Sequence, residues 1–184
     1  MTNEIVDLLS ELVGHPTISN RPVDAISESL ASRAEDAGGT VECVETEPGK
    51  HNVIARFGPN DQDGLIISGH MDVVPVEGQP WTSDPFKLTN RNGVLYGRGT
   101  ADMKGFIAAI TVALKSVPMS DLTRELVLVW THDEEVGCKG SRALAEHYTG
   151  ALPSSAWIGE PTPYGIPWAT ESASNCSMGE SKVT

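Results

Sequence analysis

Residues 65–72, Leu-Ile-Ile-Ser-Gly-His-Met-Asp, join a short apolar run to a histidine and an aspartate. Such a run predicts a strand that is buried on both faces, as in a parallel sheet covered by helices. Residues 125–130, Glu-Leu-Val-Leu-Val-Trp, form a second run of this kind, and Thr-His-Asp-Glu-Glu follows it at 131–135. A shorter run at 156–158 leads into Gly-Glu-Pro at 159–161. Each of these predicted strands therefore ends in histidine or acidic residues.

Helical patterns alternate with the predicted strands. Apolar residues recur every three or four positions at 5–13 and at 23–37, and two glycines at 38–39 end the second pattern. The alternation predicts an α/β fold, a three-layer sandwich built on a mainly parallel sheet. The other expected elements are helices at 102–117 and 140–147, half-exposed strands at 41–44 and 52–57, and a hairpin with strands at 86–88 and 94–96 around Asn90–Gly93.

Length and composition set limits on the class of protein. The chain has 184 residues, 39% of them hydrophobic, which fits one domain with a core that needs no disulfides. Its net charge of -12 argues against nucleic-acid binding, because phosphate contacts need clustered lysine and arginine. No apolar run approaches the roughly 18 residues of a membrane span. The first residues lack a signal-peptide pattern, so we expect a cytoplasmic protein without membrane attachment.

His70 and Asp72 are the first candidate site residues. In open α/β sheets, ligands bind at the carboxyl ends of the strands, which is where this pair falls. The two residues are two positions apart on extended chain, so their side chains share a face. This suits a metal-binding imidazole whose other ring nitrogen contacts a carboxylate. A surface histidine beside an unrelated acid is the alternative.

Four further acids complete the candidate site. Asp102 follows a glycine-containing segment and could bridge two metal ions about 3.5–4 Å apart, although a helix N-cap is the alternative. Glu134 and Glu135 are adjacent carboxylates, and a cation would remove their mutual repulsion. One of them could bind metal while the other accepts a proton from water. An acidic surface loop is the alternative for this pair, and an ordinary loop acid is the alternative for Glu160.

Four longer motifs contain the candidate residues. They are SGHMDVVP at 68–75, YGRGTADMKG at 96–105, DEEVG at 133–137 and GEPT at 159–162. Together these motifs resemble one family of di-zinc hydrolases, which contains acetylornithine deacetylase, succinyl-diaminopimelate desuccinylase, aminoacylase and carboxypeptidase G. The resemblance covers about residues 1–167, and two softer features, PTIS at 16–19 and WTSDPF at 81–86, are typical of the acetylornithine deacetylases.

The resemblance implies hydrolysis of N2-acetyl-L-ornithine to ornithine and acetate in arginine biosynthesis. Removal of succinate from succinyl-diaminopimelate, or hydrolysis of another N-acyl amino acid or dipeptide, is the alternative. The implied cofactor is zinc, and cobalt suits the same ligands. The peptide bond after Asp102 is expected to be cis. The implied roles are one zinc on His70 and Glu160, a metal bridge at Asp102, the second zinc on Glu135, the general base at Glu134, and orientation of His70 by Asp72.

The chain also departs from the family pattern. Family members are about twice as long, and a lid and dimerisation domain interrupts their catalytic domain before its second half supplies another histidine ligand. No histidine follows His147, so the second zinc would keep only Asp102 and Glu135, and the dimer interface would be missing. We expect residues 1–167 to be the N-terminal part of the catalytic domain and 168–184 to be a disordered tail. A truncated or frameshifted reading frame is our hypothesis, and a non-catalytic fragment is a further alternative.

Overall fold

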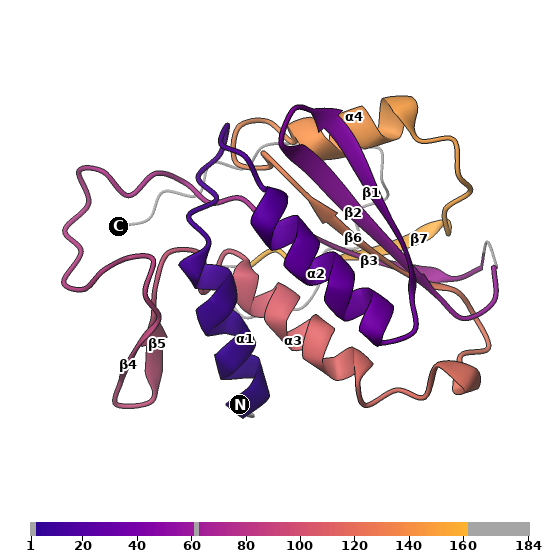
Figure 1. Ribbon diagram of the computed structural model, residues 1–184, viewed down its shortest axis with the longest axis horizontal. Helices are drawn as coiled ribbons and strands as arrows, with labels where there is room; N and C mark the ends of the chain where they lie inside the picture. The colour runs from indigo at the N-terminus through magenta and orange to yellow at the C-terminus, as the bar shows by residue number, and fades with distance from the viewer. Residues whose placement is uncertain (1–2, 61–62, 162–184) are drawn as a thin grey trace.

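A computed structural model describes residues 3–60 and 63–161 of the chain. The predicted end of the domain at 167 and the predicted tail at 168–184 lie outside these residues. Figure 1 shows a twisted central sheet with helices on both of its faces. The strands of this sheet, in spatial order, are β1 (Thr40–Glu47), β2 (Lys50–Phe57), β6 (Leu126–Thr131), β3 (Leu65–His70) and β7 (Ser155–Ile158).

The sheet is mainly parallel, as predicted. β3 pairs in parallel with both β6 and β7, whereas β2 pairs antiparallel with both β1 and β6. In the described part of the chain, β1, β3, β6 and β7 therefore point the same way and β2 points the opposite way. Pro48 and Gly49 reverse the chain between β1 and β2, and Gly49 has a φ of 74°, which glycine adopts without steric cost.

Helices cover both faces of the sheet and complete the predicted three-layer sandwich. On one face, buried apolar residues of three helices pack on alternate strand residues such as Phe57 and Trp130. On the other face, Leu144 of a fourth helix packs on Ile54 and Val129. The helices are α1 (Asn3–Gly14), α2 (Asp24–Asp36) and α3 (Lys104–Leu114) on the first face and α4 (Lys139–His147) on the second, with a short 3-10 turn η1 at Met119–Asp121.

The prediction that residues 52–57 form a half-exposed strand is wrong. β2 lies between β1 and β6 beneath helices on both faces, so Val53 and Ile54, whose side chains point to opposite faces, are both buried. Polar residues on this strand also have buried partners, since the Asn52 side chain donates to the carbonyl of Gly140 at 2.9 Å. The polar residues of β2 are therefore hydrogen-bonded inside the fold, and their alternation with apolar residues does not mark a face that is exposed to solvent.

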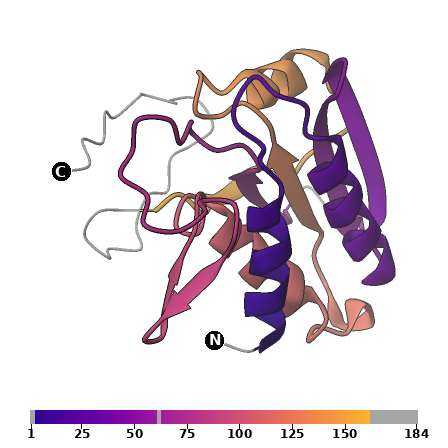
Figure 2. The ribbon, with the colours of Figure 1, turned by 60° about the vertical axis from the view of Figure 1, so that its left-hand side comes forward.

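The predicted hairpin is present with a shifted first strand. Its strands are β4 (Thr89–Arg91) and β5 (Val94–Tyr96), and they project away from the main sheet in Figure 2. Asn92 and Gly93 have φ values of 54° and 85° and form the turn. Because this turn has two residues, Arg91 pairs directly with Val94, and the predicted strand at 86–88 lies too far from the turn to take part.

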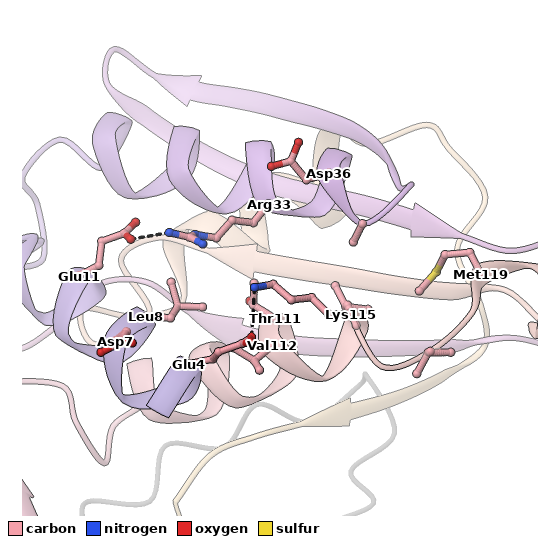
Figure 3. A pocket seen from close by; sticks show the side chains of 13 residues that line it. Glu4, Asp7, Leu8, Glu11, Arg33, Asp36, Thr111, Val112, Lys115 and Met119 are labelled. Atoms are coloured by element: carbon pink, nitrogen blue, oxygen red, sulfur yellow. Dashed lines mark hydrogen bonds and ion pairs between the residues drawn. The ribbon is translucent and has the colours of Figure 1, made fainter. Parts of the chain in front are cut away.

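A cavity of about 700 Å³ lies between α1, α2 and α3 (Figure 3). Acidic side chains of α1 and α2 line it, and two of its ion pairs join the helices, Arg33 to Glu11 and Lys115 to Glu4. None of the predicted site residues lines this cavity. The described helices also lack the length and apolar character that crossing a membrane would require.

Candidate metal centre

The predicted site residues meet at one edge of the sheet. β3, β6 and β7 are neighbouring parallel strands, so their carboxyl ends lie together. His70 is the last residue of β3, the pair Glu134 and Glu135 follows β6, and Glu160 follows β7. Asp102 reaches the same edge from the segment that precedes α3. Residues separated by as many as 90 positions thus form one cluster, which we call the rim site.

His70 is the centre of the rim site. Its Nε2 atom lies 3.0 Å from an Asp102 oxygen, 3.7 Å from a Glu160 oxygen and 3.9 Å from a Glu134 oxygen. The ligand atoms of His70, Asp102 and Glu135 form one group within 4.8 Å of one another, and those of His70, Glu134 and Glu160 form a second. The imidazole is 1% exposed, whereas the side chains of Asp102, Glu134 and Glu160 are 34–48% exposed. The acids therefore line the open side of a buried imidazole.

Asp72 contacts His70 and also holds the neighbouring loops. His70 Nδ1 lies 3.0 Å from the Asp72 carbonyl oxygen and 3.5 Å from its carboxylate. The carboxylate accepts hydrogen bonds from the backbone N–H groups of Glu134 at 2.9 Å and Glu135 at 3.4 Å. It also accepts the hydroxyl of Ser19 at 2.7 Å. Asp72 thus connects the imidazole to the backbone of Glu134 and Glu135. The contact of Ser19 was not predicted from the sequence, although Ser19 belongs to the PTIS stretch at 16–19.

Asp102 is not the N-cap residue of a helix, which was the alternative to a metal ligand. α3 begins at Lys104 with Met103 as its N-cap residue, so the predicted helix start at 102 is two residues early. The peptide bond between Asp102 and Met103 is cis, as the resemblance implied. Gly99 before it has a φ of 82°, and a Cβ atom there would lie 2.7 Å from a Val73 methyl group. The glycine-containing segment therefore allows the close approach that brings Asp102 to His70.

The pKa values at the rim site indicate that its carboxylates outnumber its cationic groups. Burial raises the pKa of both Glu135 and Glu160 to about 7, and the charge on Asp102 adds to each shift. Burial lowers the pKa of His70, but hydrogen bonds to Asp102 and Asp72 outweigh this and raise it to about 11. A proton on the imidazole therefore partly balances the acids when no metal is bound.

These side chains fit a zinc ion by type and spacing. Zinc binds imidazole nitrogen and carboxylate oxygen at about 2.0–2.2 Å, so two tetrahedral ligand atoms lie roughly 3.4 Å apart. The distances of 3.0 Å and 3.7 Å from His70 Nε2 to Asp102 and Glu160 bracket this separation. Burial and, to a lesser extent, neighbouring carboxylates raise the pKa of Glu135 and Glu160, and a divalent cation would offset both effects.

Other polar residues near the rim site stay outside both ligand groups. Cys138 lies close enough for its thiol to donate to Glu134 at 3.4 Å. His132 is buried, and its Nε2 atom contacts the Thr46 hydroxyl at 2.7 Å. Lys104 is fully buried, donates to the carbonyls of Leu12 and His15 at the end of α1, and has a pKa that burial lowers to about 7. Sequence reasoning missed this lysine, although it belongs to the motif that contains Asp102.

Comparison with known families identifies the fold and the motifs. The model of peptidase family M20/M25/M40 matches residues 66–166, which is more than half of the chain. The chain belongs to this family. The match begins inside β3 and contains every predicted site residue, from His70 to Glu160.

Several curated relatives of the chain carry the name acetylornithine deacetylase. Acetylornithine deacetylase of Vibrio campbellii (strain ATCC BAA-1116) is 45% identical over 137 residues, which is 74% of this chain and 36% of the relative. Acetylornithine deacetylase of Proteus mirabilis (strain HI4320) is 40% identical over 165 residues, which is 85% of this chain and 42% of the relative. The chain thus spans about two fifths of the length of the relatives it matches.

Solved structures of family members share the fold. A metallo-carboxypeptidase of the M20 family from Sulfolobus solfataricus matches with a TM-score of 0.74 at 26% identity, over 86% of this chain and 37% of that one. Human carnosine dipeptidase 1 matches with a TM-score of 0.68 at 26% identity, over 85% of this chain and 38% of that one. The α/β sandwich described above therefore corresponds to somewhat more than a third of each of these longer chains.

Proposed function

We propose that the rim site is a metal site for hydrolysis of an amide bond, with N2-acetyl-L-ornithine as the substrate. The observation that carries the proposal is a buried imidazole whose Nε2 atom faces the carboxylates of Asp102, Glu134 and Glu160 at 3.0–3.9 Å. Family membership and the names of relatives at 40–45% identity support the reaction and the substrate. Zinc is the proposed metal, and cobalt would suit the same nitrogen and oxygen ligands.

We assign the metal ligands and the catalytic residues as follows. His70, Asp102, Glu135 and Glu160 would hold metal, and Asp102 would be the ligand common to two ions. Bound zinc would supply a Lewis acid that polarises the acyl carbonyl. Asp72 would fix the ring of His70 through the contacts at Nδ1.

Glu134 is the proposed general base. Its carboxylate is 34% exposed at the open side of the site, and Asp72 holds its backbone N–H at 2.9 Å. Glu134 would take a proton from the attacking water and pass it to the amine nitrogen as the amide C–N bond breaks. Asp72 would keep this carboxylate beside the acyl carbon by anchoring the backbone that carries it.

The test is metal analysis and hydrolysis by the purified chain as printed. We expect bound zinc and release of ornithine from N2-acetyl-L-ornithine, with slower release of product from N-succinyl-diaminopimelate. Glu134→Gln should keep metal and reduce turnover by about 100-fold or more, as loss of a general base does. Zinc binding without hydrolysis of either substrate would show that this chain is a metal-binding fragment. Full activity in Glu134→Gln would overturn the assignment of the base.

A further inference from the structure

A buried ion pair lies directly behind the acidic residues of the rim site. Lys50 Nζ and Asp133 Oδ1 are 2.8 Å apart, and the two side chains are only 6% and 3% exposed. The same Asp133 oxygen accepts the backbone N–H of Asn20 at 2.7 Å, and Lys50 also donates to the carbonyl of Arg21. Three segments therefore meet here, namely the loop that follows α1, the start of β2 and the end of β6.

Asp133 also has an unusual backbone conformation. Its φ is 51°, in the left-handed region that aspartate tolerates better than most residues, and Asn20, which bonds to it, has a φ of 65°. Glu134 and Glu135 follow Asp133 at once. We call residues 133–135 the acidic turn, because the φ of its first residue decides where the next two carboxylates point.

The acidic turn is held from two sides. On one side, the Asp72 carboxylate accepts the backbone N–H groups of Glu134 and Glu135. On the other side, Lys50 and the Asn20 backbone hold the Asp133 side chain. The first contact reaches His70 through Asp72, whereas neither Lys50 nor Asp133 is a member of a ligand group. Stability alone is a weak explanation for a buried ion pair, since its desolvation offsets much of its attraction.

We infer that Lys50 and Asp133 are a positioning pair, which holds the acidic turn so that the carboxylates of Glu134 and Glu135 face His70. This inference rests on the proposed function, since it concerns the same carboxylates. It assigns the pair a role in metal binding through geometry, because neither Lys50 nor Asp133 belongs to a ligand group.

A second ion pair on the same two strands supplies a matched control. Arg56 lies at the far end of β2, and its guanidinium contacts Glu125 at 2.6 Å, directly before β6 begins. Glu125 is as buried as Asp133, with 4% of its side chain exposed. Arg56→Met therefore breaks an ion pair between the same segments at the end of the sheet opposite the rim site.

The first measurement needs no metal. In amide ¹H–¹⁵N spectra of the metal-free chain, Lys50→Met should shift the resonances of Glu134 and Glu135, whereas Arg56→Met should leave both in place. Asp133→Asn keeps the acceptor for Asn20 and the tolerance for positive φ, so it should fold and shift the same resonances by less. Unchanged resonances in both Lys50→Met and Asp133→Asn would overturn the inference.

The second measurement reports the consequence for the metal. Lys50→Met should weaken Co²⁺ binding by about 10-fold or more, in the range of changes to groups that orient ligands, and should alter the visible absorption of bound Co²⁺. Arg56→Met should change the Co²⁺ affinity by no more than about two-fold, even where it lowers the thermal stability as much as Lys50→Met does. Lys50→Arg should bind Co²⁺ more tightly than Lys50→Met. Equal effects of Lys50→Met and Arg56→Met would contradict positioning. If the unaltered chain binds no Co²⁺, the proposed function fails, and the amide shifts alone decide whether the pair holds the turn.

Discussion

Two acidic regions of this molecule differ in how their charge is balanced. In the cavity between α1, α2 and α3, Glu11 and Glu4 have cationic partners, Arg33 and Lys115, and these side chains are 34–64% exposed (Figure 3). In the rim site, several carboxylates surround one buried imidazole, and burial helps to raise the pKa of Glu135 and that of Glu160 to about 7.

This difference is the basis for proposing a metal at the rim site and not in the cavity. A net charge of -12 places acids over the surface, and exposed acids with lysine or arginine partners need no further cation. Buried acids around an imidazole retain a repulsion that a divalent ion would remove. Burial and unbalanced charge therefore favour the rim site over the cavity as the proposed metal site. Substitutions in the two regions should accordingly differ in their effect on zinc binding.

Removal of the central imidazole should have the largest effect. His70→Ala deletes the nitrogen that both ligand groups share, and we expect zinc affinity to fall by more than about 100-fold, beyond the effect of changing an outer partner. Isothermal titration with zinc at pH 7.5 measures this. His51→Ala is the control, because His51 pairs with Asp24 outside the rim site at 3.0 Å. An equal loss of zinc affinity in His70→Ala and His51→Ala would show that His70 has no special role in zinc binding.

Neutralising Asp72 should have the next largest effect. Asp72→Asn keeps the size of the side chain but weakens its contacts with His70, Glu134 and Glu135. We expect zinc affinity to fall by about 10–100-fold, as for other partners that orient a histidine ligand. Asp24→Asn should leave the affinity unchanged. Wild-type zinc affinity in a folded Asp72→Asn variant would argue against an orienting role.

Zinc binding should depend on pH through the same carboxylates. Glu135 and Glu160 have pKa values of about 7 in the metal-free chain, so zinc must displace their protons at pH 6 but not at pH 8. Affinity should therefore rise between pH 5.5 and 7.5, with more protons released at the lower pH. Titrations in buffers of different ionisation enthalpy count these protons. A flat affinity over this range would contradict the account.

The metal-free fold should show a matching dependence of stability. The folded pKa of Glu135 is raised to about 7 from an ordinary value of 4.5, so its contribution is fully present below pH 4.5 and is lost as pH rises to 7. Unfolding in urea should therefore show the unaltered chain losing stability relative to Glu135→Gln over this window. Glu11→Gln, in the cavity, is the comparison variant. The opposite slope would mean that burial and the neighbouring carboxylates do not raise the pKa of Glu135 in the folded chain.

The cavity should respond least. The side chains of Glu4 and Lys115 are 64% and 59% exposed, and such pairs contribute less than about 1 kcal/mol. Glu4→Gln should therefore change the free energy of unfolding by less than this and leave zinc affinity unaltered. Urea unfolding and zinc titration of the same variant check both statements. A loss of zinc binding here would show that the two acidic regions are coupled.

Much of this fold could be predicted because strand ends and helix patterns are local signals. The apolar run at 65–69 and the acids after β6 and β7 predicted that His70, Glu134, Glu135 and Glu160 lie at one edge of the sheet, and they do, since parallel neighbours share an edge. The start of α3 was missed because Asp102 resembles an N-cap in sequence, although Met103 takes that position. The burial of β2 was missed because its two faces are covered by different parts of the chain, α2 before the strand and α4 much later in the sequence.

The contacts that hold the site are mostly non-local. Lys50 and Asp133 are 83 positions apart, and the Ser19 hydroxyl reaches a carboxylate 53 positions away. No periodicity in a single sequence connects such residues, because their meeting depends on how β2, β6 and the loop after α1 pack. Sequence motifs could therefore name the candidate ligands and Asp72, whereas the contacts of Ser19 and of the Lys50–Asp133 pair emerged from the structure.

The ligands of the bound metal are the most direct test of the central claim. X-ray absorption at the zinc edge of the zinc-loaded chain should show a shell of nitrogen and oxygen at about 2.0–2.2 Å that contains a single imidazole, from His70. The imidazole signal should disappear in His70→Ala and persist in His51→Ala. A zinc–sulfur distance of about 2.3 Å, which would place Cys138 on the metal, or an unchanged imidazole signal in His70→Ala would contradict the account.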